Sequence, residues 1–501
     1  MSKKELEKKF QEKILAYALK NALEHEGKAQ AGSILSSLFH EGLDKKDIKE
    51  IMPLIQETIK KINLMSKEEQ EREFKKEQKE VSHRDTRAED ELPELPDMKN
   101  KKAKVVMRIA PYPSGPLHIG NTRQLLLNDE YVKEYGGKLY LIIDDTIGSE
   151  EKKIILEAYK MIEEGSKWLD VKYEKPVIFK SDRLEIYYKY AEELIKKGKA
   201  YVCYCNQETL RENRKSQKEC EHRSQSPEQA LKEWKKMFSM KEGQATLRIK
   251  TSMQHPNPAF RDRVLFRISE RIHPKIKNKY KVWPLLEFSW AIDDHLLAMT
   301  HVVRGKELMI ETDMEQYIMD IFKWKHPIFI HTGLLQFEGI KLSKSKGQKE
   351  VKSGNYLGYH DPRLWSLQSL EMRGIQPEAI RKFIVSLGTN QNEITVPIDI
   401  LYKYNRDIIK ENAVKASFEP IKAPEKKRIN VLNKAHNPKN KNNLSQGKSK
   451  FSIIMPDASI IKFNSDLNTK SLKDKRIIHF LGFGFCQYNK DEKVKFWFCH
   501  Q

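Results

Sequence analysis

The sequence predicts an α/β protein built on a doubly wound parallel sheet, and two stretches of the chain carry this prediction. In the first, an apolar strand at Val105–Ile109 is followed by a helix at His118–Tyr135 and a second apolar strand at Leu139–Ile143. In the second, the stretch Val302–Gly305 is followed by a helix and then by the strand Ile328–Leu335. Continuous apolar strands that alternate with helices are typical of parallel sheets with helices on both faces. Such sheets bind their ligands at the carboxyl ends of the strands.

The segments around the two sheet halves differ from this pattern. Residues 1–64 carry apolar side chains at helical spacing, and residues 65–102 are rich in Glu, Lys and Pro. The interval between the sheet halves is polar and irregular, which indicates an inserted domain. We predict a helical appendage (1–64), a linker or an exposed helix followed by a linker (65–102), the first sheet half (103–200), an insert (201–285), the second sheet half (286–350), a helical region (351–408) and a β-rich domain (409–501).

The composition points to a polyanionic partner. The chain has 501 residues and a formal net charge of +21, and residues 401–501 hold 21 Lys or Arg against 9 Asp or Glu. Clustered basic side chains gain affinity for phosphates by releasing counterions, although a lysine-rich proteome would give the same composition. The chain contains no signal-peptide pattern and no apolar run of about 18 residues, so we expect a cytoplasmic protein without a membrane partner.

Two short motifs together indicate a nucleotide site. The first is Pro113–Pro116 followed by His118–Asn121, which we call the histidine motif; the second is Lys341–Ser345, which we call the lysine motif. A small-residue turn between a strand and a helix cradles phosphates, because the helix N-terminus presents free N–H groups and the positive end of its dipole. A Lys-Ser-Lys-Ser run by itself is usually a solvated loop. Their order along the chain makes an accidental match improbable.

The two motifs resemble the ATP motifs of class I aminoacyl-tRNA synthetases, and further residues narrow the resemblance to glutamyl-tRNA synthetases of the archaeal and eukaryotic type. The resemblance covers about residues 1–430 and includes Arg108–Pro111, Asp144–Thr146, Ser181–Arg183, Asn257-Pro258, Arg261-Asp262, Asp293–His295, Arg304–Lys306 and Asp361–Arg363. It implies a Rossmann-type parallel sheet, an acceptor-end-binding insert, a helical stem-contact region and a β-rich anticodon-binding domain. It also implies ATP with Mg²⁺, L-glutamate and tRNA(Glu) as substrates.

The resemblance assigns roles to individual residues. His118, Lys341 and Lys344 are expected to be catalytic. The expected ATP site consists of Pro116, His118, Gly120, Asn121, Lys341, Ser343, Lys344 and Ser345. The expected glutamate site consists of Arg108, Ala110, Asp144 and Arg304, with tRNA contacts from Arg261, Asp262, Asp361 and Arg363.

Arg304 decides between glutamate and glutamine. A guanidinium matches the side-chain carboxylate of glutamate in a bidentate pair, whereas a buried cation beside the neutral amide of glutamine is costly. The alternative for Arg304 is a structural salt bridge with Asp293 or Asp294. Asp144 is expected to receive the α-ammonium group of the substrate.

Several residues depart from the family pattern. Tyr112 stands where a small polar residue is usual, and Ile142 stands where an arginine precedes the acidic pair. Ile147-Gly148 replaces Asp-Pro, and Leu286 lies near a position that is often a tyrosine. These departures leave the details of the glutamate site open.

Four residues of the insert form a predicted metal site. Cys203, Cys205, Cys220 and His222 provide three thiolates and an imidazole, the ligand set of a structural zinc ion. The resemblance agrees, because the family often carries a zinc or its remnant in this insert. The alternative is that these are free thiols of a reducing compartment, since five cysteines argue against a disulfide framework.

The predicted function is ligation of glutamate to tRNA through a glutamyl-adenylate. Alternatives are a glutaminyl enzyme and a tRNA-binding paralogue with impaired catalysis. The sequence leaves open whether tRNA(Gln) is also charged and whether the N-terminal helices dock a protein partner. The resemblance implies a pair of anticodon-binding β-barrels, and the unusual ending of the chain predicts that the distal one is abbreviated or altered.

Overall fold

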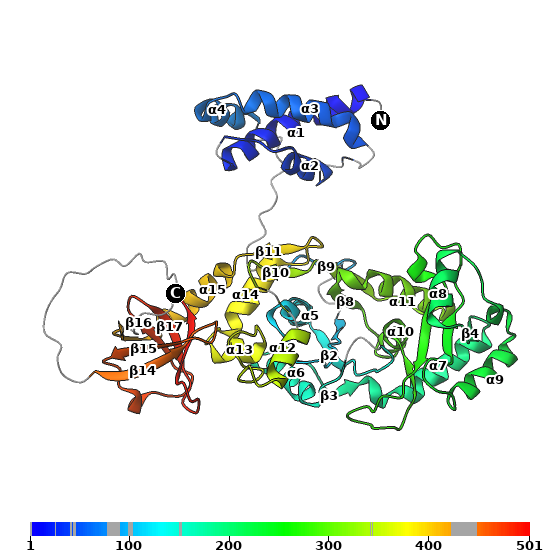
Figure 1. The fold of residues 1–501 in the computed structure, drawn as a ribbon. Coiled ribbons are helices and arrows are strands. Elements are labelled where there is room, and N and C mark those ends of the chain that lie inside the picture. Colours follow the sequence, from blue (N-terminus) through cyan, green and yellow to red (C-terminus); the bar gives the residue numbers. More distant parts are fainter. Residues whose placement is uncertain are drawn as a thin grey trace, which may run out of the picture. The chain divides into compact units, whose positions relative to one another are not determined.

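The computed structural model describes residues 3–25, 27–40, 43, 47–77, 91–98, 104–149, 153–340, 342, 344–421 and 448–501. The chain forms two compact units, Met1–Ala88 and Glu89–Gln501. Each unit is described by itself (Figure 1). No helix in the described ranges is long and apolar enough to cross a membrane.

The first unit is a small bundle of helices with its own apolar core. Its helices are α1 (Lys3–Glu24), α2 (Ala31–His40), α3 (Ile48–Ile62) and α4 (Lys67–Glu77). Helix α4 lies in residues 65–102, for which the sequence allows an exposed helix before a linker, and in the structure this helix is docked on the bundle. Its Gln70 is fully buried and donates from Nε2 to the carbonyl oxygens of Gly27 and Ile62, while Phe74 packs against the core. One buried amide and one ring are enough to dock an otherwise charged helix.

The second unit is built on parallel strands from two separate stretches of the chain. One sheet pairs β1 (Val105–Ile109), β2 (Gly137–Ile143) and β3 (Glu174–Phe179), and the other pairs β8 (His301–Gly305) with β9 (Ile328–Thr332). The two sheets meet at Thr300, whose backbone N–H donates to Val106 O and whose hydroxyl accepts from Val106 N, both at 2.9 Å. The strand order is therefore β3-β2-β1-β8-β9, which confirms the predicted doubly wound class.

Helices alternate with the strands of this sheet, and a glycine ends the first of them. The helices of this region are α5 (Thr122–Tyr135), α6 (Leu156–Trp168), α7 (Leu184–Lys196), α10 (Leu286–Leu296), α11 (Met309–Phe322) and α12 (Lys344–Lys352), of which α5 packs against β1, β2 and β8. Helix α5 ends at Gly136, which has φ +70°, and a Cβ on the next residue, Gly137, would lie 1.9 Å from Val105 O. Only glycine lets β2 start this close to β1.

One strand is shorter than the sequence predicts. The apolar run Ile328–Leu335 is split into β9 and a separate β10 (Leu335–Phe337), which pairs with β11 (Ile394–Val396). The break falls at Gly333, whose N–H donates to Asn390 O at 2.9 Å. A Cβ at Gly333 would lie 1.8 Å from Asn392 O, so the chain turns where another backbone passes closely.

The insert is an antiparallel sheet with helices on its flank. It consists of β4 (Ala200–Cys203), β5 (Thr246–Ile249), β6 (Val264–Ile268), β7 (Val282–Pro284), α8 (Gln207–Lys215) and α9 (Pro227–Met237). Its core, around Trp234, Phe266 and Trp283, continues into α7 and α11 of the parallel-sheet region. The insert is therefore packed onto the sheet rather than loosely tethered.

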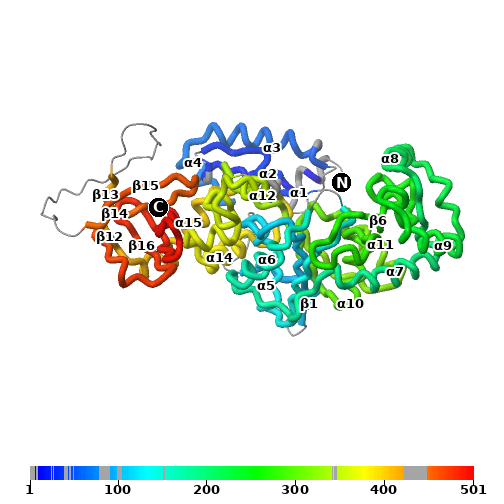
Figure 2. The backbone as a smooth tube through the Cα atoms, turned by 60° about the horizontal axis from the view of Figure 1, so that its bottom comes forward, coloured from blue at the N-terminus to red at the C-terminus, as the bar shows by residue number. Residues whose placement is uncertain are grey.

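The C-terminal strands form one mixed sheet in the order β12-β16-β17-β18-β14-β15-β13. Helices α13 (Leu367–Met372), α14 (Pro377–Leu387) and α15 (Asp399–Ile409) precede β12 (Val414–Ala416), β13 (Glu419–Pro420), β14 (Ser449–Ile454), β15 (Ile460–Ser465), β16 (Ile477–Phe480), β17 (Gly484–Tyr488) and β18 (Phe496–His500). Buried Arg373 donates to the carbonyl oxygens of Phe498 and Cys499, which fixes β18 to α13. The tube view shows α14 and α15 between the parallel sheet and this C-terminal sheet (Figure 2).

Candidate active site

The histidine motif lies in a loop that forms backbone hydrogen bonds with the segment that leads from α12 into α13. Two backbone hydrogen bonds flank His118: Ile119 N donates to Trp365 O at 3.0 Å, and Leu367 N donates to Leu117 O at 2.9 Å. Pro116 is buried and His118 is partly exposed. The position of the imidazole therefore depends on residues about 250 positions later in the chain, which are just beyond the lysine motif.

Gly120 is the point at which the two motifs touch. A Cβ at this residue would lie 3.0 Å from His118 Cε1 and 3.0 Å from Leu342 Cδ1, so there is little room for any side chain. Asn121 Oδ1 accepts from His118 N at 3.2 Å and closes a 3-10 turn over Ile119–Asn121, and α5 begins only at Thr122. The helix thus starts four residues later than the sequence predicts, because this turn occupies its expected beginning.

The lysine motif is only partly covered by the described residues. Lys341 and Ser343 lie outside them, and so do the side chains of Lys344 and Ser345. The described part is Leu342, which packs over the histidine motif, and the backbone of α12, which begins at Lys344. A helix that begins beside a phosphate-cradling loop adds a second positive dipole end to the same place.

Beside these motifs lies a buried group of charges around the indole ring of Trp290. Arg108, Lys180 and Arg304 each place their cationic group over this ring, at 5.0, 4.9 and 5.2 Å from its centroid. All three residues are at most 4% exposed. They come from the ends of β1, β3 and β8, so the strand ends bring together cations that are far apart in the sequence.

Each of these cations has a carboxylate partner. Arg108 forms a bidentate pair with Asp294, and Lys180 donates to Asp144 Oδ2 at 3.1 Å and to Ser289 Oγ at 2.7 Å. Burial lowers the pKa of Lys180, against the attraction of Asp144. Asp144, expected to receive the substrate ammonium, therefore already holds an ammonium group of the protein itself.

Arg304 has a different partner from the two that the sequence suggested. Its Nη1 donates to Glu315 Oε1 at 2.7 Å, and its Nε and Nη2 donate to Thr312 Oγ1. Asp293 instead accepts from Arg183 Nε at 2.8 Å and from Tyr187 OH at 2.6 Å. A salt bridge of Arg304 with Asp293 or Asp294 is thus not what the structure shows, because both carboxylates are already paired with other arginines.

The residues that depart from the family pattern lie around this group. Ile142 is fully buried in β2, and the buried Ile147 contributes to the core of the insert. A Cβ on Gly148 would lie 3.2 Å from Pro284 O, so this glycine lets the loop approach β7. Burial and the Asp144 carboxylate raise the pKa of Tyr112. Leu286 and the expected substrate contact Ala110 are partly exposed.

The four predicted metal ligands come together in the insert. The ligand atoms of Cys203, Cys205, Cys220 and His222 all lie within 4.8 Å of one another. The Cys203 and Cys220 sulfurs are 3.8 Å apart, and Cys205 Sγ lies 3.6 Å from His222 Nδ1. A tetrahedral zinc ion with bonds of about 2.3 Å to sulfur and about 2.0 Å to nitrogen requires separations of about 3.8 Å and about 3.5 Å. The donor set therefore fits such an ion.

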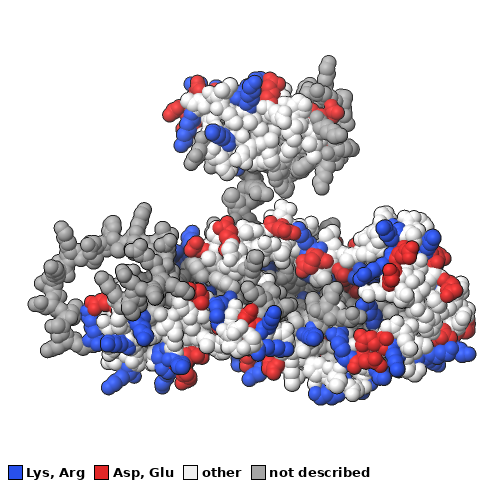
Figure 3. All heavy atoms as spheres, viewed as in Figure 1, with Lys and Arg blue, Asp and Glu red and all other residues white. Residues whose placement is uncertain are grey.

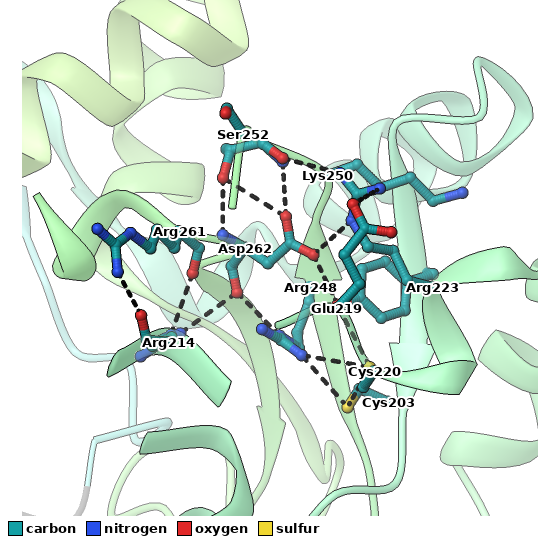
Figure 4. A network of polar contacts seen from close by, with 12 residues as sticks. Cys203, Arg214, Glu219, Cys220, Arg223, Arg248, Lys250, Ser252, Arg261 and Asp262 are labelled. Atoms are coloured by element: carbon teal, nitrogen blue, oxygen red, sulfur yellow. Dashed lines mark hydrogen bonds and ion pairs between the residues drawn. The ribbon is translucent and has the colours of Figure 1, made fainter. Parts of the chain in front are cut away.

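Arg261 and Asp262, the predicted tRNA contacts of the insert, belong to a buried network (Figure 4). Arg261 donates to the carbonyl oxygens of His255 and Arg214, and Asp262 accepts from Tyr201 OH, Arg223 Nε and Thr251 N. Arg248 links this network to the cysteines, with Nη1 at 3.5 and 3.6 Å from the Cys203 and Cys220 sulfurs. In the structure these side chains hold the insert together.

The second predicted tRNA pair, Asp361 and Arg363, is a local clamp. Asp361 is fully buried and accepts from Leu357 N and from the backbone and side chain of Arg363. The Arg363 guanidinium also lies 3.9 Å from the ring centroid of Tyr356. Burial by itself would raise the pKa of Asp361, but the hydrogen bonds from Arg363 and Leu357 N lower it below its usual value. Of the two, only Arg363 keeps a substantially exposed side chain.

Lys180, Trp290 and Glu315 are site residues that the sequence did not single out. Lys180 directly precedes the matched motif Ser181–Arg183, so adjacency was a usable signal for it, and Trp290 lies three residues before the matched motif Asp293–His295. Glu315 lies in the middle of a helix among other acidic residues, where no spacing marks it.

Parallel strands in this order, with a histidine loop and a helix N-terminus meeting at one edge, define a class I aminoacyl-tRNA synthetase. Comparison with known proteins agrees: residues 104–411 match the family described as tRNA synthetases class I (E and Q), catalytic domain. This chain belongs to that family.

Three relatives illustrate the similarity. The chain is 44% identical to a glutamate–tRNA ligase of Pyrococcus furiosus over 403 residues, which are 79% of this chain and 70% of that protein. It is 40% identical to the enzyme of that name from Methanothermobacter marburgensis, over 82% of this chain and 73% of the relative. A crystal structure of a glutamate tRNA ligase from Elizabethkingia meningosepticum is more distant, with 20% identity, a TM-score of 0.44, and coverage of 62% of this chain and 70% of that one.

Proposed function

We propose that the chain is an ATP-dependent ligase that attaches glutamate to tRNA through an enzyme-bound glutamyl-adenylate. Membership of the E and Q family supports the ligase chemistry, and the relatives of 40–44% identity are glutamate–tRNA ligases. In the first step the α-carboxylate of glutamate attacks the α-phosphate of ATP, and in the second the terminal ribose hydroxyl of tRNA attacks the adenylate. Both steps depend mainly on positioning and on cations that stabilise phosphate charge.

The observation that carries the choice of glutamate is Arg304 at the carboxyl end of β8. It is buried beside Arg108 at the edge of the sheet where ligands bind. We assign it to the side-chain carboxylate of glutamate, with Arg108 and Ala110 lining the same site and Asp144 near the substrate ammonium. A buried guanidinium favours a carboxylate over an amide, which argues against the glutaminyl alternative.

The ATP site is assigned to the two motifs that meet at Gly120. His118, with Pro116, Gly120 and Asn121, would hold the adenosine and phosphates, and the lysine motif would close over the triphosphate. In this assignment Lys341 and Lys344, with Ser343 and Ser345, stabilise the leaving pyrophosphate together with Mg²⁺. The contact of Leu342 with Gly120 supports it, because any ligand of one motif is then within reach of the other. Intact ATP motifs also argue against a paralogue without catalysis.

We further propose one structural zinc ion held by Cys203, Cys205, Cys220 and His222. The separations of the donor atoms support this assignment. When bound, the ion would cross-link the insert and stabilise its fold, and it would take no part in the reaction. Arg248 places positive charge beside two of the sulfurs and donates from Nε to Asp262 O, so hydrogen bonds connect the proposed metal site to the residue next to Arg261. We therefore assign Arg261 and Asp262 as positioning residues for the acceptor end of tRNA.

The remaining tRNA contacts are assigned to Arg363, braced by Asp361, and to the C-terminal sheet. Residues 448–501 hold ten Lys or Arg against five Asp or Glu. On the face drawn in Figure 3, basic side chains outnumber acidic ones over this sheet. A cleft of about 540 Å³ there is lined by Lys415, Lys473 and Arg476 among others. Such a surface suits a single-stranded anticodon loop, whether of tRNA(Glu) alone or of tRNA(Gln) as well.

Two further assignments complete the proposal. The N-terminal helical unit is a docking module for a protein partner, since it forms a compact body of its own. The enzyme works in the cytoplasm, where translation provides its tRNA.

The deciding experiment is a charging assay with purified tRNA(Glu) and tRNA(Gln), each with glutamate and with glutamine. We expect ATP-dependent glutamylation of tRNA(Glu). Glutaminylation without glutamylation would overturn the assignment of Arg304, and the absence of charging with all four pairs would overturn the ligase itself.

A further inference from the structure

Glu315 is a buried carboxylate that the reaction as proposed does not use. It comes from the middle of α11, is 0% exposed, and places Oε1 2.7 Å from Arg304 Nη1. Its other oxygen, Oε2, is buried and has no hydrogen-bond partner among the described residues. A buried carboxylate oxygen without a donor is costly when the group is ionised, and a proton on that oxygen removes the cost.

Each cation around Trp290 already has a carboxylate partner before any substrate binds. Four cations face four carboxylates in pairs, namely Arg108 with Asp294, Lys180 with Asp144, Arg183 with Asp293, and Arg304 with Glu315. Glutamine adds no net charge to this cluster. Glutamate adds one buried negative charge, and the cation assigned to that charge is the one that Glu315 already holds.

Arg304 has the donors to hold both carboxylates. A guanidinium has five N–H bonds, and the contacts with Glu315 and Thr312 described above use three of them. Two carboxylates on one buried arginine leave an excess negative charge, which like-charge pairs in proteins relieve by sharing one proton. We propose that Glu315 is a specificity-determining residue, which neutralises Arg304 in the free enzyme and takes up one proton from solvent when the side-chain carboxylate of glutamate binds. This inference rests on the proposed function.

The surroundings of Glu315 favour protonation of this carboxyl group over protonation of its neighbours. Burial raises the pKa of Glu315 to about 7, against the attraction of Arg304, with Asp294 raising it and Arg108 lowering it. Arg304 comes from β8, Arg108 from β1 and Asp294 from α10. On β9, His331 Nε2 lies 2.8 Å from Thr312 Oγ1, and burial together with Arg304 lowers the pKa of this imidazole. The histidine therefore stays neutral near pH 7, and the carboxyl group is the acceptor.

A pH profile follows from this proton. Below about pH 7 Glu315 is already protonated in the free enzyme, so the affinity for glutamate is flat. Above that pH each binding event takes up one proton, and the apparent KM for glutamate should rise about tenfold per pH unit. Glutamine shares the α-ammonium and α-carboxylate but needs no extra proton. The glutamate-to-glutamine ratio of kcat/KM therefore isolates the effect from titration elsewhere in the enzyme.

The experiment combines this profile with a direct count of protons. ATP–pyrophosphate exchange is measured on the full chain with tRNA present from pH 6 to 8.5, for both amino acids. Calorimetric titration of glutamate at pH 8, in buffers of different ionisation enthalpy, gives the number of protons taken up, with an expected value near one. Glu315→Gln should bring this number to zero, flatten the profile and bind glutamate about tenfold better than wild type at pH 8.

Glu311→Gln is the matched control. Glu311 lies one turn earlier on α11, pairs with Arg263 at 2.6 Å and also has a buried Oε2 without a partner among the described residues. This variant should keep the proton uptake and the slope of wild type. Glutamate activity without proton uptake in wild type at pH 8, or an unchanged slope in Glu315→Gln, would overturn the inference and leave the proposed function intact. The number of protons that the wild-type enzyme takes up on binding glutamate tests the inference even if Glu315→Gln does not fold. Failure of wild type to activate glutamate at any pH would overturn both.

Discussion

Arg304→Cys tests the choice of substrate and also a structural role of the same arginine. The substitution removes the cation proposed to meet the side-chain carboxylate of glutamate. It also leaves Glu315, which is fully buried, without its partner at 2.7 Å. Loss of glutamate activity in this variant alone would therefore not separate a substrate contact from damage to the protein.

The expected magnitude follows from the burial. Breaking a buried ion pair by removal of one partner costs about 3–5 kcal/mol. With about 1.36 kcal/mol per decade, the kcat/KM for glutamate should fall by roughly two to four decades. Glutamine carries no charge at that position, so its kcat/KM should fall much less. The stranded Glu315 predicts in addition a lower melting temperature, since the variant must bury an unpaired carboxylate or protonate it.

The double variant Arg304→Cys/Glu315→Gln separates the two effects. It removes the stranded carboxylate, so the melting temperature should recover while glutamate activity stays low. The assay is ATP–pyrophosphate exchange with tRNA present, for both amino acids, in wild type, both single variants and the double variant. Full recovery of glutamate activity in the double variant would refute the substrate contact, and so would a glutamate-to-glutamine ratio unchanged by Arg304→Cys.

Three further outcomes are expected. His118→Ala and Lys344→Ala should each lose about 10²–10³ in the rate of adenylate formation while keeping tRNA affinity, and normal charging by either would reject the ATP site. Gly120→Ala should slow adenylate formation, because its Cβ would lie 3.0 Å from both motifs, whereas Gly32→Ala, with no atom within 4 Å, should be neutral. Purified protein should contain one zinc ion per chain by metal analysis, and Cys220→Ser should lower the zinc content and charging together; zinc-free active protein would contradict the metal site.

The parts of the fold that sequence could predict are those in which one local pattern has one structural solution. Continuous apolar strands with glycine-ended helices between them predict a parallel sheet, because both faces must be covered. The four residues proposed to bind zinc lie in two short pairs, separated by an interval of 14 residues between Cys205 and Cys220. The donor atoms then meet because β4 and the turn after α8 lie side by side.

The rest depends on contacts between distant segments. The break after β9 is set by Asn390 and Asn392, some 60 residues beyond Gly333, and the docking of α4 is set by one buried glutamine. Arg261 and Asp262 are predicted as tRNA contacts from a family resemblance, yet in the structure they are held by partners in α8 and in the turn at Arg223. Periodicity reports which face of an element is apolar, and it carries no information about which buried polar groups are paired.

The pairing of buried charges also explains why Ile142 can replace the arginine that usually precedes the acidic pair Asp144-Asp145 at the end of β2. A buried carboxylate such as Asp144 needs a cation or several donors wherever they come from. Here the cation is Lys180, which follows the neighbouring strand β3 and donates from Nζ to Asp144 Oδ2 at 3.1 Å. Thr146 Oγ1 donates to the other carboxylate oxygen, Oδ1, at 3.1 Å. With Asp144 satisfied in this way, position 142 is free to be part of the apolar core. The motif residues can be recognised because they occur at fixed positions in the sequence, whereas the charges that balance them can come from any strand end or helix around Trp290.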